Sequence, residues 1–268
     1  MSARCALALH DVHYRYGPTE VLHGIDIQLA AGEVLVLVGP SGCGKTTLLH
    51  LAAGLLVCQQ GRVDNGFANT AVMFQQPRLL PWQRTVDNIA LGLRAAGFKA
   101  ARARRDAAEM GRAMGLDDDA LGAYPMQLSG GMQSRAALAR ALVLQPDLLL
   151  LDEPFSALDI GLKAQLHALL RSHVRRRGTA VLMITHDLTE AAALADRVLV
   201  MAAGPGRIVH EWRPAADAAP ADEAQAHQAV AWLLREGAVR AAFDLPPLPG
   251  AAAQPPANVH RLPGVRQG

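Results

Sequence analysis

A nine-residue segment from Gly39 to Thr47, with the sequence G-P-S-G-C-G-K-T-T, constrains the fold of this chain more than any other feature. It matches the pattern G-x-x-x-x-G-K-[ST] and lies between an apolar run, Val34–Val38, and a stretch from Thr46 to Leu56 that we expect to be helical. Glycines let the backbone curl tightly enough to aim successive N–H groups at phosphate oxygens, and the following helix points its positive end at the same anion. The segment therefore predicts a strand, a phosphate-binding loop and a helix.

The pattern also predicts roles within the loop. The Lys45 ammonium is expected to reach the β- and γ-phosphates, and the Thr46 hydroxyl is expected to ligate Mg²⁺. Cys43 occupies a variable position, where we expect a structural role and a thiol whose alkylation blocks nucleotide binding. The residues predicted to contact ATP here are Gly39, Pro40, Ser41, Gly42, Cys43, Gly44, Lys45, Thr46 and Thr47.

A second element supplies carboxylates. Four leucines, Leu148–Leu151, precede Asp152 and Glu153 and predict a buried strand with an acidic pair at its carboxyl end. Ligands of open α/β sheets bind at this edge, so we expect Asp152 to hold Mg²⁺, through water, and Glu153 to polarise the attacking water. Taken alone, the pair would more often be an acidic surface pair that caps a loop, but a phosphate-binding loop requires an acidic partner.

The remaining apolar runs outline an α/β domain. Two strands, Leu7–Tyr16 and Gly24–Leu29, are expected around a turn at Gly17-Pro18. Further short apolar runs with helical stretches between them favour a largely parallel sheet: Ala71–Phe74, Ala180–Ile184 and Val198–Met201. Between Thr85 and Leu144 the apolar residues recur at helical spacing, which predicts a helical block inserted into the sheet domain.

Composition excludes several other classes. The net charge of +2 is too small to indicate nucleic acid as a partner. The three cysteines have neither disulfide-framework nor metal-ligand spacing, which is typical of a reducing cytosol. We expect no signal peptide, and no apolar run approaches the roughly 20 residues that a membrane-spanning helix needs. If the protein serves a membrane process, another chain is expected to cross the bilayer.

The segment Leu128–Gln133, L-S-G-G-M-Q, is similar to the L-S-G-G-x-Q signature of ABC transporter ATP-binding subunits. With the loop and the L-L-L-L-D-E-P run, the chain resembles this family from about Leu7 to Glu211. The glycine turn opens a helix at about Met132, whose N–H groups and the Ser129 hydroxyl can grip a γ-phosphate. The resemblance implies that this phosphate belongs to ATP on a second copy of the chain, bound through Leu128, Ser129, Gly130, Gly131 and Gln133.

Four further positions match the family individually. Tyr16 resembles the aromatic residue that stacks on adenine, although a half-buried strand tyrosine remains an alternative. Gln75 resembles the glutamine that contacts Mg²⁺ and the attacking water, with adjacent Gln76 as an alternative. Asp159 resembles the aspartate of the loop at the dimer interface, and His186 resembles the histidine that contacts the γ-phosphate. The implied catalytic residues are Glu153, His186 and Gln75, and the implied Mg²⁺ residues are Thr46, Gln75 and Asp152.

One position departs from the family. Gln, Lys or Arg commonly follows the signature, where this chain has Ser134, while Arg135 keeps the next basic position. We expect the change to weaken a surface contact without abolishing ATP binding.

The resemblance implies an α/β fold: a P-loop NTPase core of the ABC ATPase type with an N-terminal antiparallel β region and an inserted α-helical subdomain. We expect the ATPase domain over residues 1–213, with the helical subdomain at about 77–144. Residues 214–268 are rich in Ala and Pro in places and are expected to form an accessory tail, partly disordered, with a helix possible over Asp222–Glu236.

The segment Phe74–Trp82, F-Q-Q-P-R-L-L-P-W, resembles importers for nitrate, sulfonates and taurine, as do Leu194–Val198 and Gly204–Val209. The family docks its membrane subunit where Leu79, Leu80 and Trp82 lie. The implied partners are a second copy, transmembrane permease subunits and, indirectly, a periplasmic solute-binding protein, with the chain peripheral on the cytoplasmic side of the inner membrane. Export or lipid traffic, and a soluble ABC protein acting on ribosomes or DNA, remain alternatives.

Overall fold

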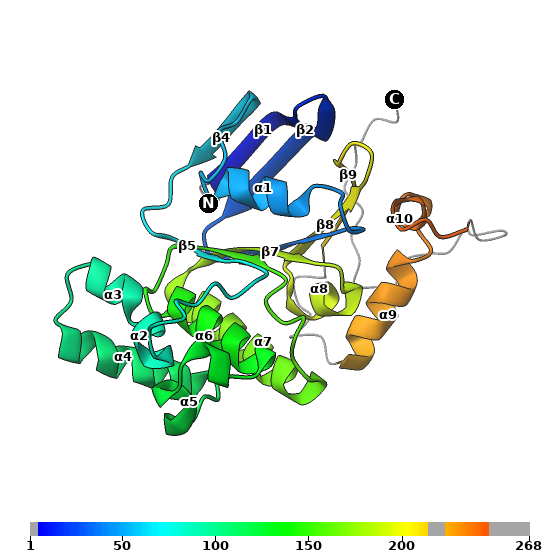
Figure 1. Ribbon diagram of the computed structural model, residues 1–268. Helices are drawn as coiled ribbons and strands as arrows, with labels where there is room; N and C mark the ends of the chain where they lie inside the picture. Colours follow the sequence, from blue (N-terminus) through cyan, green and yellow to red (C-terminus); the bar gives the residue numbers. More distant parts are fainter. Residues whose placement is uncertain (1–4, 214–222, 247–268) are drawn as a thin grey trace. The chain divides into compact units, whose positions relative to one another are not determined.

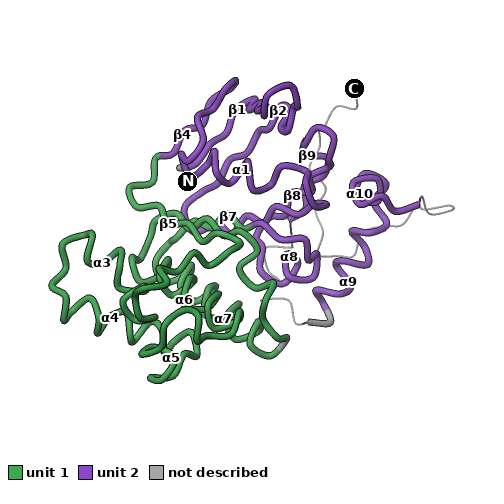
Figure 2. Tube along the Cα trace, in the orientation of Figure 1, with its two compact units in different colours: residues 1–4, 66–183 green, residues 5–65, 184–268 purple. Residues whose placement is uncertain are grey.

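The computed structural model of the protein describes residues 5–213 and 223–246. The chain divides into two compact units (Figure 2). Of the described residues, unit 1 comprises 66–183, and unit 2 comprises 5–65, 184–213 and 223–246. Unit 2 is therefore built from segments that are far apart in the sequence, with most of unit 1 inserted between them.

A three-stranded antiparallel sheet belongs to unit 2. Strands β1 (Cys5–Tyr16), β2 (Thr19–Ala30) and β4 (Gln60–Asn65) lie in the order β2-β1-β4. The turn between β1 and β2 falls at Gly17-Pro18, as predicted. Strand β2 begins earlier than expected, and β4 was not predicted, because its residues are mostly exposed and show no apolar periodicity.

Unit 2 also contains strands β3 (Val34–Val38), β8 (Arg197–Ala202) and β9 (Arg207–Trp212). Strands β3 and β8 are parallel and buried along their whole length, which explains their continuous apolar runs. Strand β9 pairs with β8 in the antiparallel direction and was not predicted. The predicted bounds of β3 are confirmed.

The described residues of unit 2 also form four helices: α1 (Lys45–Ala52), α8 (Leu188–Leu194), α9 (Glu223–Leu233) and α10 (Gly237–Ala242). Helix α1 ends four residues earlier than predicted, just before Gly54, which has φ of 69°. Helix α9 contacts α8, and α10 contacts β8 and β9. Part of the tail is thus packed in unit 2, while residues 214–222 and 247–268 lie outside the described residues.

Strands β5 (Thr70–Met73), β6 (Leu148–Asp152) and β7 (Ala180–Thr185) lie in the order β5-β6-β7. Strands β5 and β6 are parallel, with Met73 opposite Leu151. Their carboxyl ends therefore meet at the same edge of the sheet in unit 1. This register places the residues that follow the two strands beside each other.

The helices of unit 1 include the predicted helical block. Between residues 77 and 144 the described elements are all helical: α2 (Thr85–Ile89), α3 (Leu91–Ala95), α4 (Ala100–Ala113), α5 (Asp118–Gly122), the 3₁₀ helix η1 (Pro125–Gln127) and α6 (Gly130–Leu142). Helix α2 contacts α4, α5 and α6 (Figure 1). The longest helix of the described residues, α7 (Ile160–Arg177), follows β6.

Candidate nucleotide-binding and catalytic residues

The loop before α1 depends on two glycines. Gly44 precedes α1 with φ of 99°, and a Cβ there would lie 2.8 Å from the Leu22 side chain. A Cβ on Gly39 would lie 2.4 Å from the carbonyl oxygen of Met201, which is closer than real contacts allow. The backbone conformation requires glycine at position 44, and the close approach of β8 requires glycine at position 39.

Lys45 is buried at the first position of α1, with 7% of its surface exposed. Its Nζ donates hydrogen bonds to the carbonyl oxygens of Gly39 and Pro40, each at 2.9 Å. The ammonium is thus folded back onto the loop, while Ser41, Gly42 and Thr46 are exposed. A positive charge and the start of a helix lie together here, which is the arrangement that binds phosphate.

Cys43 is buried inside the same loop, with its Sγ 3.8 Å from the Lys45 Nζ. Burial raises the pKa of the Cys43 thiol, and the nearby Lys45 charge opposes this shift only in part. A raised pKa favours the neutral thiol, as the predicted structural role requires.

Tyr16 ends β1 and is 51% exposed, which suits both a stacking residue and the half-buried strand tyrosine named as the alternative. Its ring makes an edge-to-face contact with Tyr14, with centroids 5.0 Å apart. The Gln59 side chain holds the preceding backbone at both ends: it accepts from the Arg15 N–H at 2.8 Å and donates to the Arg15 carbonyl at 3.0 Å. An exposed ring on a held backbone is suited to stacking. No sequence signal indicated Gln59.

Gln75 and Glu153 lie side by side after β5 and β6. The Gln75 Nε2 donates a hydrogen bond to the Glu153 Oε2 at 3.3 Å, which favours Gln75 over Gln76 for the predicted role. Glu153 has φ of 47°, a conformation that non-glycine residues seldom adopt and that is concentrated at functional sites. Asp152 is buried at the end of β6, with 3% of its surface exposed.

Helix α6 begins within the signature segment, at Gly130, two residues before the predicted helix start at about Met132. Ser129 is the N-cap, and its Oγ accepts from the Met132 N–H at 3.2 Å. The Gln133 side chain donates to the carbonyl oxygens of Pro125 and Leu128 at 3.0 and 3.3 Å, which ties the glycine turn to the preceding 3₁₀ helix. The segment therefore has a fixed backbone at a helix N-terminus.

Ser134 differs from the prediction. It is buried, with 8% exposed, so its side chain does not form the surface contact that we expected it to weaken. Its helical position faces the interior of unit 1. The neighbouring Arg135 donates to the carbonyl oxygens of Gly115 and Met114 at 2.6 and 3.3 Å.

Asp159 and His186 occupy the starts of helical segments. The Asp159 carboxylate caps α7 by accepting from the Leu162 N–H at 2.9 Å. His186 is exposed after β7 and precedes Asp187, which caps α8 by accepting from the N–H groups of Thr189 and Glu190. Local capping thus fixes the backbone at both predicted positions.

The segment Pro77–Trp82 is held by two side chains that the sequence did not single out. The Arg140 guanidinium donates to the carbonyl oxygens of Pro77 and Arg78 at 2.7 and 3.0 Å. The buried Asn88 side chain accepts from the Leu80 N–H and donates to the Leu80 carbonyl. Trp82, at the end of this segment, is 71% exposed at the surface of unit 1.

The predicted residues divide between the units. Unit 2 carries the phosphate-binding loop, Tyr16 and His186, and unit 1 carries Gln75, Asp152, Glu153, the signature segment and Asp159. Within the described ranges, no helix is long and apolar enough to cross a membrane.

Comparison with known proteins gives a consistent result. The family model described as ABC transporter matches residues 22–156. The aliphatic sulfonates import ATP-binding protein SsuB 1 of Pseudomonas fluorescens is 48% identical over 203 residues, which cover 75% of each chain. The taurine import ATP-binding protein TauB of Escherichia coli O157:H7 is 42% identical over 210 residues, covering 76% of this chain and 82% of that protein.

A solved structure is also similar. The ATP-binding cassette MJ0796, in a dimeric post-hydrolysis state bound to ADP and Pi, has a TM-score of 0.70 and 27% sequence identity. The match covers 76% of this chain and 97% of that one.

Proposed function

The chain belongs to the ABC transporter family, and we propose that it is the ATP-hydrolysing subunit of an importer for a sulfonate, taurine, nitrate or a related small solute. The observation that carries the catalytic part is the hydrogen bond between Gln75 and Glu153 at the ends of two parallel strands. Relatives named as sulfonate and taurine import proteins support the direction of transport and the solute class.

Hydrolysis needs a base and an oriented water molecule more than covalent chemistry. We assign the base to the Glu153 carboxylate. The Gln75 amide that donates to Glu153 also carries a carbonyl oxygen, which can accept a hydrogen bond from the same water. His186, exposed after β7, is proposed to contact the γ-phosphate.

Nucleotide binding is assigned to the loop before α1 and to Tyr16. The backbone N–H groups from Gly39 to Thr47 and the Lys45 ammonium neutralise phosphate charge, and the Tyr16 ring stacks on the base. Thr46, Gln75 and Asp152 offer hydroxyl, amide and carboxylate oxygens, the ligand types that Mg²⁺ prefers. Bound Mg²⁺ would supply further neutralisation of phosphate charge.

A second copy of the chain is the proposed partner for the signature segment. The capped start of α6 presents backbone N–H groups and Ser129, which suits the γ-phosphate of ATP on that copy, with Asp159 at the interface. The similar cassette MJ0796 is a dimer, which supports this assembly.

The permease is the second proposed partner. The exposed Trp82 with Leu79 and Leu80 forms an apolar edge that suits a membrane subunit, which would place the chain on the cytoplasmic side of the inner membrane. A periplasmic solute-binding protein would act through that permease. We also propose that residues 1–213 form the ATPase domain, with 214–268 accessory to it.

The test has two arms. In the first, the purified chain should hydrolyse ATP, and Glu153→Gln should bind ATP, hydrolyse little and accumulate as a dimer. In the second, deletion of the gene should abolish growth on a sulfonate or taurine as sulfur source, or on nitrate as nitrogen source, and wild-type but not Glu153→Gln should restore it. Normal growth on all three would exclude sulfonates, taurine and nitrate as the solute, and full turnover by Glu153→Gln would overturn the catalytic assignment.

A further inference from the structure

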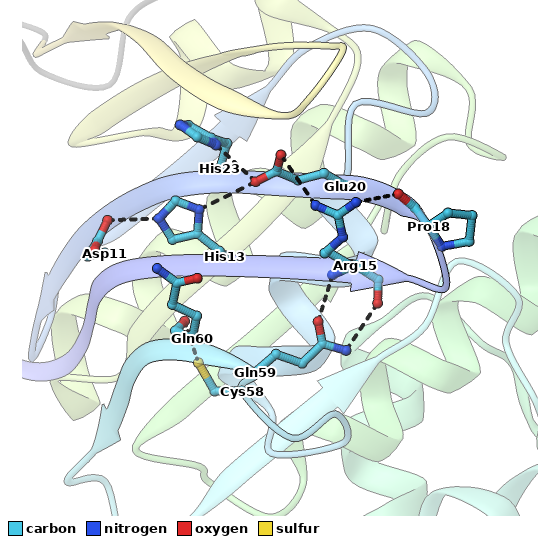
Figure 3. Close-up of polar contacts among 9 residues, drawn as sticks. All are labelled: Asp11, His13, Arg15, Pro18, Glu20, His23, Cys58, Gln59 and Gln60. Carbon is cyan, nitrogen blue, oxygen red and sulfur yellow. Dashed lines mark hydrogen bonds and ion pairs between the residues drawn. The ribbon is translucent and has the colours of Figure 1, made fainter.

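His13, Glu20 and His23 bring three metal-type ligand atoms together on the β1–β2 hairpin (Figure 3). The atoms all lie within 4.8 Å of one another. The Glu20 Oε1 is 3.5 Å from the His13 Nδ1 and 2.9 Å from the His23 Nδ1. Two imidazoles thus face one carboxylate oxygen, and something positive must lie between them: a proton or a cation.

The pairing of the two strands builds this cluster. Val12 pairs with Ile25 and Tyr14 with Leu22, so that His13 alone opposes both His23 and Gly24. This two-against-one arrangement is a β-bulge, which redirects side chains locally. The apolar neighbours Val12, Leu22 and Ile25 are completely buried and anchor the hairpin, leaving the polar side chains on its other face.

A second carboxylate prepares His13 as a ligand. The Asp11 Oδ1 lies 3.0 Å from the His13 Nε2, and because an ionised carboxylate only accepts, this nitrogen carries the ring proton. A ring that carries its proton on Nε2 alone turns the lone pair of Nδ1 toward Glu20. Asp11 is itself held, since its backbone N–H donates to the Asp26 carboxylate at 3.1 Å. Metal-ligating histidines are commonly oriented by a carboxylate in this way.

The charges of the cluster favour a cation. Among the ion pairs of the described residues, the cluster contains the carboxylates of Asp11 and Glu20 and the guanidinium of Arg15, whose Nη1 is 3.9 Å from the other Glu20 oxygen, Oε2. The Nη2 of Arg15 donates to the Pro18 carbonyl.

We propose that His13, Glu20 and His23 form a zinc-binding site, with Asp11 orienting His13. Two imidazole nitrogens and one carboxylate oxygen suit Zn²⁺. They do not suit Mg²⁺ or Ca²⁺, which prefer oxygen ligands. Tetrahedral bonds of about 2.0–2.1 Å require ligand atoms roughly 3.4 Å apart, close to the 3.5 Å between His13 and Glu20. The 2.9 Å between His23 and Glu20 is a hydrogen-bond distance, and it would widen when the ion replaces the proton. The fourth position stays open to water.

Bound Zn²⁺ would join β1 to β2 across the turn that follows Tyr16. The side chains of His13, Glu20 and His23 are 17%, 30% and 56% exposed, so an ion can enter from solvent while the site remains partly shielded. This site lies in unit 2 and uses none of the residues proposed for ATP or Mg²⁺.

The test is Zn²⁺ binding to the full chain without a histidine tag, after chelator treatment and in the absence of nucleotide. Calorimetry should show one Zn²⁺ per wild-type chain at this site, and Co²⁺ should give the visible spectrum of a four-coordinate ion. The paired substitution of His13→Ala and His23→Ala should abolish both signals. Asp11→Asn should weaken binding about 10- to 100-fold, because it removes only the orienting carboxylate.

His10→Ala is the matched control, since His10 lies on β1 outside the cluster. It should bind Zn²⁺ as the wild type does. His23→Gln is a second variant at the most exposed of the three positions, and circular dichroism would verify its fold. Absence of Zn²⁺ binding by the wild type, or equal binding by the His13/His23 double variant, would overturn the site and leave a proton-bridged hydrogen-bond cluster.

Discussion

The side-chain amide of Gln75 donates a hydrogen bond to the carboxylate of Glu153, with 3.3 Å between Nε2 and Oε2. The two residues are 78 positions apart in the sequence. They meet because β5 and β6 are parallel and end at the same edge, with Met73 opposite Leu151.

Replacement of either partner should separate catalysis from binding. Glu153→Gln should lower kcat about 10²- to 10⁴-fold, the usual contribution of a general base, while ATP affinity persists. Gln75→Ala should also lower kcat. The adjacent substitution Gln76→Ala is the control and should keep a kcat close to that of the wild type. Single-turnover ATPase and nucleotide binding measure the two effects. A larger loss of activity in Gln76→Ala would transfer the role to Gln76.

Gly39→Ala should destabilise the protein. The added Cβ would meet the Met201 carbonyl oxygen at 2.4 Å, and such overpacking typically costs about 1–3 kcal/mol. Gly237→Ala is the control, because nothing lies within 4 Å of a Cβ at this helix start. Denaturant unfolding compares the free energies, and equal stability of the two variants would contradict the close approach of β8 to the loop.

Ser129 has a capping role and a proposed phosphate-binding role that two variants can separate. Ser129→Ala should lower the free energy of unfolding by about 1 kcal/mol, because the Met132 N–H loses its acceptor. Ser129→Asp should keep the cap and yet reduce ATP hydrolysis, since its charge repels phosphate. Full activity of Ser129→Asp would show that no phosphate approaches this position.

Cys43 should react slowly with alkylating reagents at neutral pH. Its raised pKa and burial keep the thiol neutral and covered, whereas Cys58 is partly exposed and serves as the internal comparison. Mass spectrometry after iodoacetamide treatment measures both rates, and faster labelling of Cys43 would contradict the structure.

The same shift affects stability at alkaline pH. Above the ordinary thiol pKa the unfolded chain loses its Cys43 proton while the folded chain retains it, so the free energy of unfolding should fall as pH rises toward the raised value. Cys43→Ser should lack this component. Unfolding curves at neutral and alkaline pH, compared between wild type and variant, measure the difference.

Arg140→Ala should uncouple hydrolysis from the proposed permease. Loss of its bonds to Pro77 and Arg78 releases the backbone before Trp82, while Gln75 and Glu153 remain in place. The isolated variant should keep its basal ATPase activity and lose stimulation by the permease that co-purifies with the wild-type chain. Arg140→Lys should recover only part of this stimulation, because an ammonium cannot donate to both carbonyl oxygens with the geometry of a guanidinium. Normal stimulation of the alanine variant would contradict this role.

The sequence alone was sufficient to predict the elements whose signals are local. Val34–Val38 and Leu148–Leu151 are apolar because their strands are buried on both sides, and the loop at Gly39–Thr47 and the signature at Leu128–Gln133 consist of adjacent residues. The inserted helical block also follows from local periodicity. For these elements, the residues that determine the structure are neighbours in the sequence.

The tertiary structure decided what depends on partners distant in the chain. Strand β4 is mostly exposed and β9 only half-buried, so pairing and not hydrophobic pattern defines them. Burial of Ser134 follows from helix packing, and the cluster of His13, Glu20 and His23 follows from a bulged register between two strands. Cross-strand register and close packing are set by the whole fold, because the free energy that fixes them comes from contacts between distant segments.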